Sequence, residues 1–198
     1  MLSKSINLKS FKISKNKQKI QTKLKILLNE KNKLIKSLSK NYKDNFDFKK
    51  IKEKKNFRLI GMGGSILGSQ AIYNFLKSKV KKNFLFFNNL NSFQKINKKE
   101  KFTNLIISKS GNTLETISNA NILINRKDEN IFITENKPSY LFNLASKLKS
   151  EVVHHNNFIG GRYSVLSEVG MLPAKLMGLN PKKFRQFDNL IKNKKFFN

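Results

Sequence analysis

The sequence predicts an α/β fold in which five short strands form one mostly parallel sheet, with helices on both faces in a three-layer, doubly wound arrangement. Three observations carry this prediction. Short apolar segments alternate with segments that suit helices over residues 57–154, and this alternation favours parallel strands joined by crossover helices. The strand segments are continuous apolar runs, as expected where both faces of a sheet are covered. Turns rich in glycine or serine follow two of the strands, at the edge where such sheets bind ligands.

The chain before the first strand is expected to form a helical arm, residues 1–50. Residues 1–14 show no sustained period and are expected to be extended. Apolar side chains then recur at steps of mostly three and four, which predicts one amphipathic helix, or two with a break near residues 29–32. These side chains are Ile20, Leu24, Leu27, Leu28, Leu34, Ile35 and Leu38. The stripe lacks Trp and Phe, so packing on a neighbouring domain is favoured over lying on a membrane.

The sheet and its helices are expected in residues 51–178, after a polar connector over residues 41–55. Strands are expected at residues 57–60, 83–87, 104–107, 130–134 and 151–154. Helices are expected at residues 71–80, from the turn after residue 107 to about residue 125, and at residues 140–148, where Pro138 suits a helix start. Residues 179–198 are expected to begin a further helical segment.

One stretch, residues 106–116, has the layout of an anion site. Two isoleucines end a strand, a hydroxyl-rich turn containing Gly111 follows, and helix formers come next. Backbone N–H groups at a helix N-terminus lack intrahelical acceptors and the helix dipole adds positive charge there, so a phosphate is the natural ligand. The alternative is a plain connection in which Thr113 or Asn112 only caps the helix. These residues by themselves leave both interpretations open.

Two other turns carry unusual residues. Residues 61–65, Gly-Met-Gly-Gly-Ser, allow close approach of the backbone to a ligand, or form a plain tight turn. They are not a dinucleotide fingerprint, because the G-x-G-x-x-G spacing would need glycine at Ile66 and no acidic residue stands about twenty residues further on. Residues 158–164 place Arg162 beside two glycines. A guanidinium is a fixed cation that suits a developing oxyanion, although a buried structural ion pair is the alternative.

His154 and His155 superficially resemble a metal or acid–base pair. Adjacent residues of a strand point to opposite faces, and no carboxylate cluster accompanies them. We therefore expect histidines that lie at the surface or have their hydrogen bonds satisfied, and no metal or acid–base pair.

The composition is strongly basic, with 41 Lys and Arg against 12 Asp and Glu and a net charge of +29. Nucleic-acid binding is the obvious hypothesis, but only four of the basic residues are arginine, the better reader of phosphates and base edges. Lysine and asparagine are spread along the whole chain, which favours a general compositional bias and no specific nucleic-acid partner. Cysteine is absent, which excludes disulfides and thiolate sites. No apolar run approaches the ~20 residues of a membrane span, and a cytoplasmic protein is expected.

The three turns in combination resemble a known family. Residues 108–113, Ser-Lys-Ser-Gly-Asn-Thr, resemble the phosphate-binding loop of sugar isomerase (SIS) domains. The continuation over residues 114–116, the turn over residues 61–68 and above all residues 157–167, Asn-Phe-Ile-Gly-Gly-Arg-Tyr-Ser-Val-Leu-Ser, are similar to glucose-6-phosphate isomerases. Their order and intervals match the first SIS domain of that family over about residues 57–178.

The resemblance implies a reaction and a role for each matching residue. The family interconverts glucose 6-phosphate and fructose 6-phosphate without metal or organic cofactor. Arg162 would stabilise the cis-enediolate formed as a proton moves between C1 and C2, and Gly64 and Ser65 would line the sugar side of the pocket. The residues implied to bind the phosphate, by hydroxyl or backbone amide, are Ser108, Lys109, Ser110 and Thr113. The side chain of Lys109 could equally be solvated.

The chain also departs from the family pattern. Glu168 stands where the family more often has a small residue. The general base of the family, a glutamate, lies in a second SIS domain with a ring-opening histidine and a lysine, and no residue here matches those three. We therefore expect the N-terminal part of an enzyme that is a homodimer at full length, and weak phosphosugar binding without activity from this chain alone.

Two other classes of protein remain as alternatives. One is a non-catalytic SIS module that senses a phosphosugar beside a DNA-binding segment, although residues 1–50 show no clear helix-turn-helix. The other is a polyanion-binding module driven by charge, whose affinity would fall as salt rises.

Overall fold

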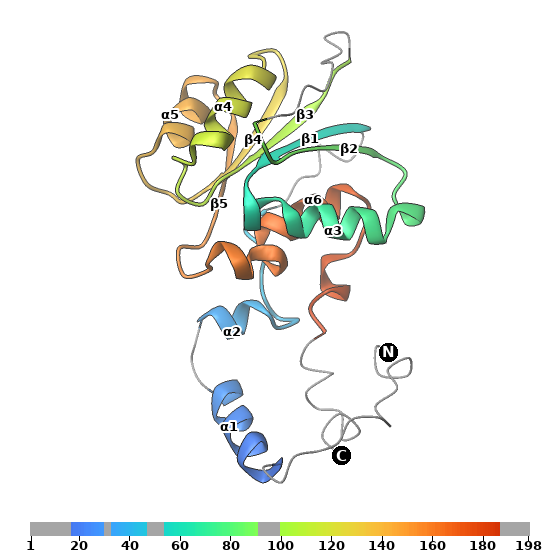
Figure 1. Cartoon of the computed structure of the whole chain (residues 1–198), viewed down its shortest axis with the longest axis vertical. Coiled ribbons are helices and arrows are strands. Elements are labelled where there is room, and N and C mark those ends of the chain that lie inside the picture. The colour runs from blue at the N-terminus through green and yellow to red at the C-terminus, as the bar shows by residue number, and fades with distance from the viewer. Residues whose placement is uncertain (1–16, 30–32, 47–53, 91–99, 187–198) are drawn as a thin grey trace. The chain divides into compact units, whose positions relative to one another are not determined.

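Five apolar segments form the strands of one sheet in the computed structural model, which describes residues 17–29, 33–46, 54–90 and 100–186 (Figure 1). Each strand lies within one residue of its predicted position. The strands are β1 (Asn56–Gly61), β2 (Asn83–Phe87), β3 (Thr103–Ile107), β4 (Glu129–Thr134) and β5 (Glu151–His154). All four pairings are parallel and the strand order is β2-β1-β3-β4-β5. The predicted α/β class with a parallel five-stranded sheet is confirmed.

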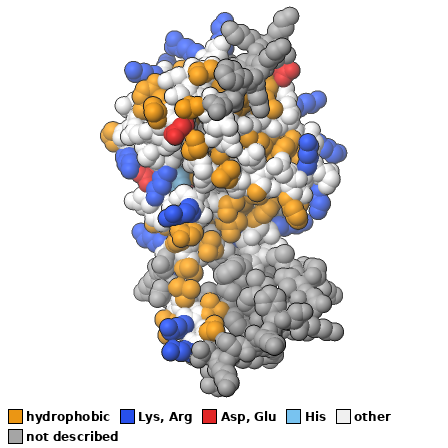
Figure 2. Space-filling view, viewed as in Figure 1, with side chains coloured by type: hydrophobic (Ala, Val, Ile, Leu, Met, Phe, Trp, Pro, Cys, Tyr) orange, Lys and Arg blue, Asp and Glu red, His pale blue; other side chains and the backbone are white. Residues whose placement is uncertain are grey.

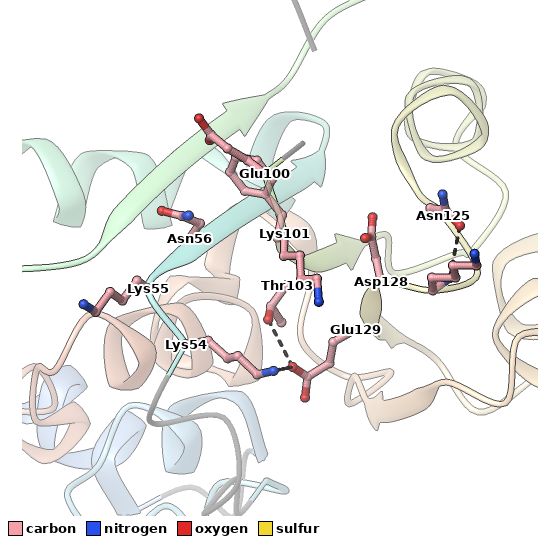
Figure 3. A pocket seen from close by; sticks show the side chains of 11 residues that line it. Lys54, Lys55, Asn56, Glu100, Lys101, Thr103, Asn125, Asp128 and Glu129 are labelled. Atoms are coloured by element: carbon pink, nitrogen blue, oxygen red, sulfur yellow. Dashed lines mark hydrogen bonds and ion pairs between the residues drawn. The ribbon is translucent and has the colours of Figure 1, made fainter. Parts of the chain in front are cut away.

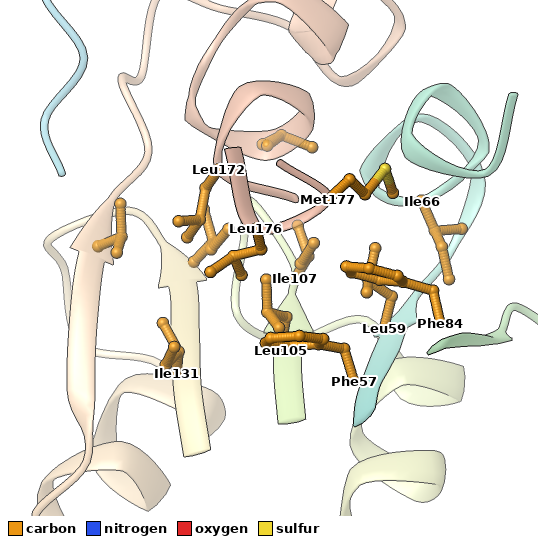
Figure 4. Packing of buried hydrophobic residues seen from close by; sticks show 13 residues of the cluster. Phe57, Leu59, Ile66, Phe84, Leu105, Ile107, Ile131, Leu172, Leu176 and Met177 are labelled. Carbon is orange, nitrogen blue, oxygen red and sulfur yellow. The ribbon is translucent and has the colours of Figure 1, made fainter. Parts of the chain in front are cut away.

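Helices cover both faces of the sheet, so the fold has three layers (Figure 1). Helices α3 (Leu67–Phe75) and α6 (Glu168–Leu176) pack on one face, and α4 (Leu114–Leu123) and α5 (Tyr140–Lys147) pack on the other. Successive strand residues point to opposite faces: Leu105 is buried against α6, whereas Ile106 is buried against α4 and α5. Figure 4 shows the first of these cores, in which Leu172 and Leu176 of α6 face the strand residues Leu105 and Ile131.

The helix predicted at residues 71–80 is α3, which begins and ends earlier and is followed by a short 3₁₀ turn, Lys77–Lys79. The prediction treated Gly68 as part of the preceding turn. In the structure Gly68 lies in the first turn of α3, where a Cβ atom would stand 2.6 Å from Cγ2 of Val165. Glycine is thus a packing requirement at this position and not a helix breaker.

The chain divides into two compact units, residues 43–181 and residues 1–42 with 182–198. The second unit contains α1 (Lys17–Asn29) and α2 (Lys33–Ser37), and both lie within the predicted amphipathic segment. In the same unit, the Arg185 guanidinium lies 4.8 Å from the centre of the Tyr42 ring. The predicted extended arm, the break after residue 29 and the boundary at residue 50 fall outside the described residues. The boundary at residue 178 stays a prediction.

The strand order creates a switch point between β1 and β3. The chain leaves β1 toward β2 on one side and continues from β3 toward β4 on the other, while Gly61 pairs with Ile107 at the carboxyl ends of β1 and β3. In open parallel sheets this is the position of ligand crevices. The turn after β1 and the loop after β3 therefore start side by side.

Candidate functional site

The loop after β3, residues 108–113, is called the serine loop below. The backbone N–H of Ser108 donates to the carbonyl of Ile133 at 3.1 Å, and that of Gly111 donates to the carbonyl of Ser108 at 3.2 Å. Gly111 has a φ of +67°, and a Cβ atom there would lie 2.1 Å from Oγ of Ser139. Only glycine fits this conformation and this contact. The serine loop is thereby held against the start of α5.

Neither proposed cap residue caps α4. Thr113 is the residue before the helix, but its side chain accepts no helix amide; its Oγ1 shares a hydrogen bond of 2.9 Å with Oγ of Ser108. Oδ1 of Asn112 accepts from the N–H of Tyr140 at 2.9 Å. Helix α5 differs, because Oγ of Ser139 accepts from its first turn. The N-terminus of α4 is thus left open at the serine loop.

Several donors of the serine loop remain available for a ligand. The backbone N–H groups of Lys109, Ser110 and Thr113 have no acceptor among the described residues. Oγ of Ser110 accepts from the N–H of Asn112 at 3.2 Å, which leaves its own proton to donate. Together with the positive end of the α4 dipole, these groups form a site that favours an anion over a cation.

The turn after β1, residues 61–65, is called the glycine turn and packs against residues 157–164, called the arginine loop. A Cβ atom on Gly64 would lie 2.1 Å from the carbonyl oxygen of Gly161 and 3.1 Å from the backbone nitrogen of Arg162. Oγ of Ser164 donates to the carbonyl of Gly64 at 3.1 Å. Ser65 is partly buried in this turn. The structure therefore places Gly64 and Ser65 beside the arginine loop. One site could contain both segments only if they were neighbours in this way.

Arg162 is exposed, and its guanidinium makes no hydrogen bond or ion pair with a described residue. The buried ion pair that was the alternative for this residue is therefore wrong within the described part of the chain. An exposed arginine without a described partner, next to the glycine turn, is available to an anionic or developing-oxyanion group.

The side chain of Lys109 is tied down and not simply solvated. Its Nζ donates to the backbone carbonyl of Asn157 at 2.6 Å and lies 3.5 Å from Oε1 of Glu135. Glu135, which also pairs with Lys137, is 7% exposed. Burial alone would raise the pKa of Glu135, but the hydrogen bonds and positive charges of Lys137 and Lys109 outweigh it and hold that pKa below its ordinary value.

Sequence reasoning missed Glu135. A signal was present, because Glu135 directly follows β4, the strand beside β3, in a chain with few acidic residues. An acidic residue at the ligand-binding edge of the sheet is a candidate for the site on the same grounds as the serines.

The two histidines lie in different environments, and Nδ1 of the buried one, His155, has no hydrogen-bond partner among the described residues. His154 is exposed and its Nδ1 accepts from the N–H of Asn136 at 3.2 Å. His155 is 1% exposed, and burial together with the positive charge of Lys109 lowers its pKa to about 4. Glu168, whose partner the sequence did not indicate, is fully buried and accepts from Nδ2 of Asn156 at 3.2 Å.

A hollow of about 690 Å³ lies at the opposite edge of the sheet, near the amino ends of β1, β3 and β4 (Figure 3). Its charges are mixed: Lys54 lies 3.6 Å from Glu129, and Oγ1 of Thr103 donates to the same carboxylate at 3.1 Å. Figure 2 shows Lys and Arg side chains scattered over one face of the described chain, with apolar side chains between them. The residues that line the hollow do not belong to the serine loop, the glycine turn or the arginine loop.

The sequence model of the family described as phosphoglucose isomerase matches residues 12–195, nearly the whole chain. The chain belongs to the phosphoglucose isomerase family. It is 34% identical over 171 residues to glucose-6-phosphate isomerase of Methanocaldococcus jannaschii, a match covering 77% of this chain and 41% of that protein. It is 36% identical over 143 residues to the Campylobacter jejuni enzyme, covering 65% of this chain and 35% of that protein. The chain thus spans less than half the length of these relatives.

Solved structures agree on the fold of this phosphoglucose isomerase family member. A hypothetical protein from Thermus thermophilus superposes with a TM-score of 0.66 at 18% identity, covering 89% of this chain and 47% of that one. Glucosamine-6-phosphate deaminase from Thermotoga maritima superposes with a TM-score of 0.52 at 22% identity, covering 84% of this chain and 52% of that one. In the described part of the chain, no helix is long and apolar enough to span a membrane.

Proposed function

We propose that this chain supplies the phosphate-binding half of a glucose-6-phosphate isomerase. The observation that carries the proposal is the open N-terminus of α4: Thr113 and Asn112 leave its amides uncapped, and the N–H groups of Lys109 and Ser110 lack acceptors among the described residues. A dianionic phosphate would satisfy these donors and interact favourably with the helix dipole. Membership of the family indicates a hexose 6-phosphate as the ligand.

Each site residue has a role in this proposal. Ser110 and Thr113 donate hydroxyl protons to the phosphate, while Ser108 orients Thr113 through their shared hydrogen bond. Gly64 and Ser65 lie along the sugar. The guanidinium of Arg162 offsets the negative charge that develops on the cis-enediolate, as a fixed cation that does not itself take up a proton.

The proton transfer between C1 and C2 needs a base that this chain lacks at the family's motif positions. A general base contributes ~10²- to 10⁴-fold to rate, and water exclusion adds to it. We therefore propose that the chain binds phosphosugar weakly and does not turn it over alone. A homodimer at full length and a cytoplasmic location are further proposals that rest on the family.

The test is titration of the 198-residue chain with fructose 6-phosphate, fructose and inorganic phosphate, followed by amide chemical shifts. Fructose 6-phosphate and phosphate are expected to move the amide signals of Lys109, Ser110 and Thr113, whereas fructose is not. Ser110→Ala should lower the affinity for both phosphate ligands by on the order of tenfold, because the variant loses one hydrogen bond to a charged group. If neither phosphate ligand moves the amide signals of the serine loop in the wild-type chain, the proposal is overturned.

A turnover assay separates the enzyme half from a non-catalytic sensor. The chain is expected to be inactive alone and to gain isomerase activity when mixed with a separately expressed C-terminal half of a relative. Robust activity of the chain alone would contradict the assignment of the proton chemistry to another domain. Binding without any gain of activity from a complementing half would favour the sensor.

A further inference from the structure

We propose that Lys109 and Glu135 act as a positioning pair that holds the arginine loop against the serine loop, so that both ends of one sugar phosphate are bound together. The inference rests on the proposed function, because it concerns how the same site is assembled. It assigns to the Lys109 side chain a task other than direct phosphate binding, and it gives Glu135 a task in the site.

The contacts of the Lys109 ammonium carry the first step. Lys109 belongs to the serine loop, yet its Nζ donates to the backbone carbonyl of Asn157, the first residue of the arginine loop, at 2.6 Å. A hydrogen bond from a cation to a carbonyl is among the stronger kinds in proteins. This bond joins two loops that are 48 residues apart in the sequence. It therefore bears on where Arg162 lies, five residues further along.

Glu135 fixes the direction in which the Lys109 side chain extends. The Glu135 carboxylate lies 3.5 Å from the ammonium and is itself 7% exposed. The backbone strengthens the link, because the N–H of Glu135 donates to the carbonyl of Lys109 at 3.1 Å and Oγ1 of Thr134 donates to the same oxygen at 3.3 Å. Lys109 is thus held at both its backbone and its side-chain end by the segment after β4. A lysine held this way cannot swing freely toward a phosphate.

Charge gives an independent reason for the pairing. A buried carboxylate beside an anion site would repel a dianionic phosphate unless it were neutralised. Glu135 is paired by two ammonium groups, Lys109 and Lys137, which leaves the group of three with a net charge of about +1. The positive charge of Lys109 is therefore largely neutralised by Glu135. The backbone amides and hydroxyl groups of the serine loop then bind the phosphate.

The experiment is a double-mutant cycle on the 198-residue chain, with Lys109→Met, Glu135→Gln and the double variant. The readout is the ratio of affinities for fructose 6-phosphate and inorganic phosphate. Phosphate needs only the serine loop, whereas the sugar phosphate needs the arginine loop as well. Each single variant should lower this ratio by on the order of tenfold, and the double variant should lower it no further, as expected for residues that act as one unit.

Two further variants sharpen the test. Lys137→Met is the matched control, because Lys137 also pairs with Glu135 but is more exposed and makes no contact with Asn157. This variant should keep the ratio of affinities within twofold of the wild-type ratio. A twofold change corresponds to about 0.4 kcal/mol, which is within the range measured for a surface ion pair. Lys109→Arg keeps the charge and the donors and should restore most of the ratio. A variant that only weakened folding would reduce the affinities for both ligands together.

Hydrogen exchange of the arginine loop supplies a readout that needs no ligand. Glu135→Gln, the nearly isosteric change, should raise exchange of residues 157–164 while leaving the core of β3 protected. Equal losses of affinity for phosphate and fructose 6-phosphate in a Lys109→Met chain that unfolds in urea like the wild type would make Lys109 an ordinary phosphate ligand and overturn the inference. Unchanged ratios and exchange would also overturn it. A wild-type chain that binds neither ligand would instead count against the proposed function.

Discussion

Acid should destabilise this protein through His155, which is 1% exposed just after the end of β5. Burial is the main cause that lowers the pKa of His155 from 6.5 to about 4. The Lys109 ammonium lowers it further, and His154 adds a small effect of the same sign, while Glu135 opposes them. Nδ1 of His155 has no hydrogen-bond partner among the described residues. A backbone hydrogen bond at Asn156 acts with Glu135 to raise the pKa of His155, but burial outweighs both.

The sign follows from where each state binds a proton. In the unfolded chain His155 is protonated below about pH 6.5, whereas in the folded chain it is protonated only below about pH 4. Between these values the unfolded state binds more protons, so the free energy of unfolding falls as the pH falls. A pKa difference of about 2.5, at about 1.4 kcal/mol for each pKa unit, gives a loss of about 3 kcal/mol once the pH is below both values.

The assay is urea unfolding followed by circular dichroism at a series of pH values, comparing the wild-type chain with His155→Gln. Glutamine cannot be protonated, so the variant should lack this part of the pH dependence. The difference between the two free energies of unfolding should change by about 2 to 3 kcal/mol from about pH 7.5 to about pH 4.5. Glu135 and the other carboxylates are present in both proteins, so their effects cancel in the difference.

His154→Gln is the matched control, because the neighbouring histidine is exposed. Its curve should follow that of the wild type. If the wild-type and His155→Gln curves run parallel through the whole pH range, the account of His155 as a buried neutral group is wrong. The direct check is the His155 ring signal in NMR, which should titrate near pH 4 and not near the ordinary value of 6.5.

Four other changes test separate parts of the structure. Gly64→Ala should cost about 1 to 3 kcal/mol of unfolding free energy because its Cβ would overlap the Gly161 carbonyl, whereas Gly161→Ala, which meets open space, should cost far less in the same urea assay. Leu172→Ala in the fully buried core under α6 should cost about 2 to 5 kcal/mol by the same measurement. Arg162→Ala should change the free energy of unfolding by no more than about 0.5 kcal/mol, because that side chain is exposed. In a titration it should lower the affinity for fructose 6-phosphate more than the affinity for inorganic phosphate. Equal losses of both affinities would contradict the assignment of Arg162 to the sugar end of the ligand. Binding to duplex DNA, measured by fluorescence anisotropy, should fall steeply between about 50 and 200 mM salt, and affinity that persists would revive the polyanion alternative.

Much of the site could be predicted from local sequence. A loop that starts at the end of an apolar strand and runs into a helix is a local pattern, so Ser108, Ser110 and Thr113 could be proposed as phosphate ligands without tertiary information. The open end of α4 could not be found this way. Whether Thr113 caps the helix or bonds to Ser108 depends on side-chain rotamers that neighbouring elements select.

Contacts between distant segments explain the rest of what was missed. Glu135 meets Lys109 only because β3 and β4 are neighbours, and Lys109 reaches Asn157 only because the arginine loop folds back over the serine loop. The local sequence places Gly68 in a turn, because its close neighbour in the structure, Val165, is almost a hundred residues away in the chain. Single-residue propensities contain no information of that range.

The sequence by itself determined the class of fold and the positions of the five strands, and it singled out the three turns of the candidate site, because apolar period and turn chemistry are local properties. The tertiary structure decided the strand order β2-β1-β3-β4-β5, which brings the turns after β1 and β3 together at one switch point. It also decided that Arg162 is unpaired within the described residues while Lys109 is tied to Glu135 and Asn157. The physical reason is that availability for a ligand depends on which partners packing brings within hydrogen-bond distance.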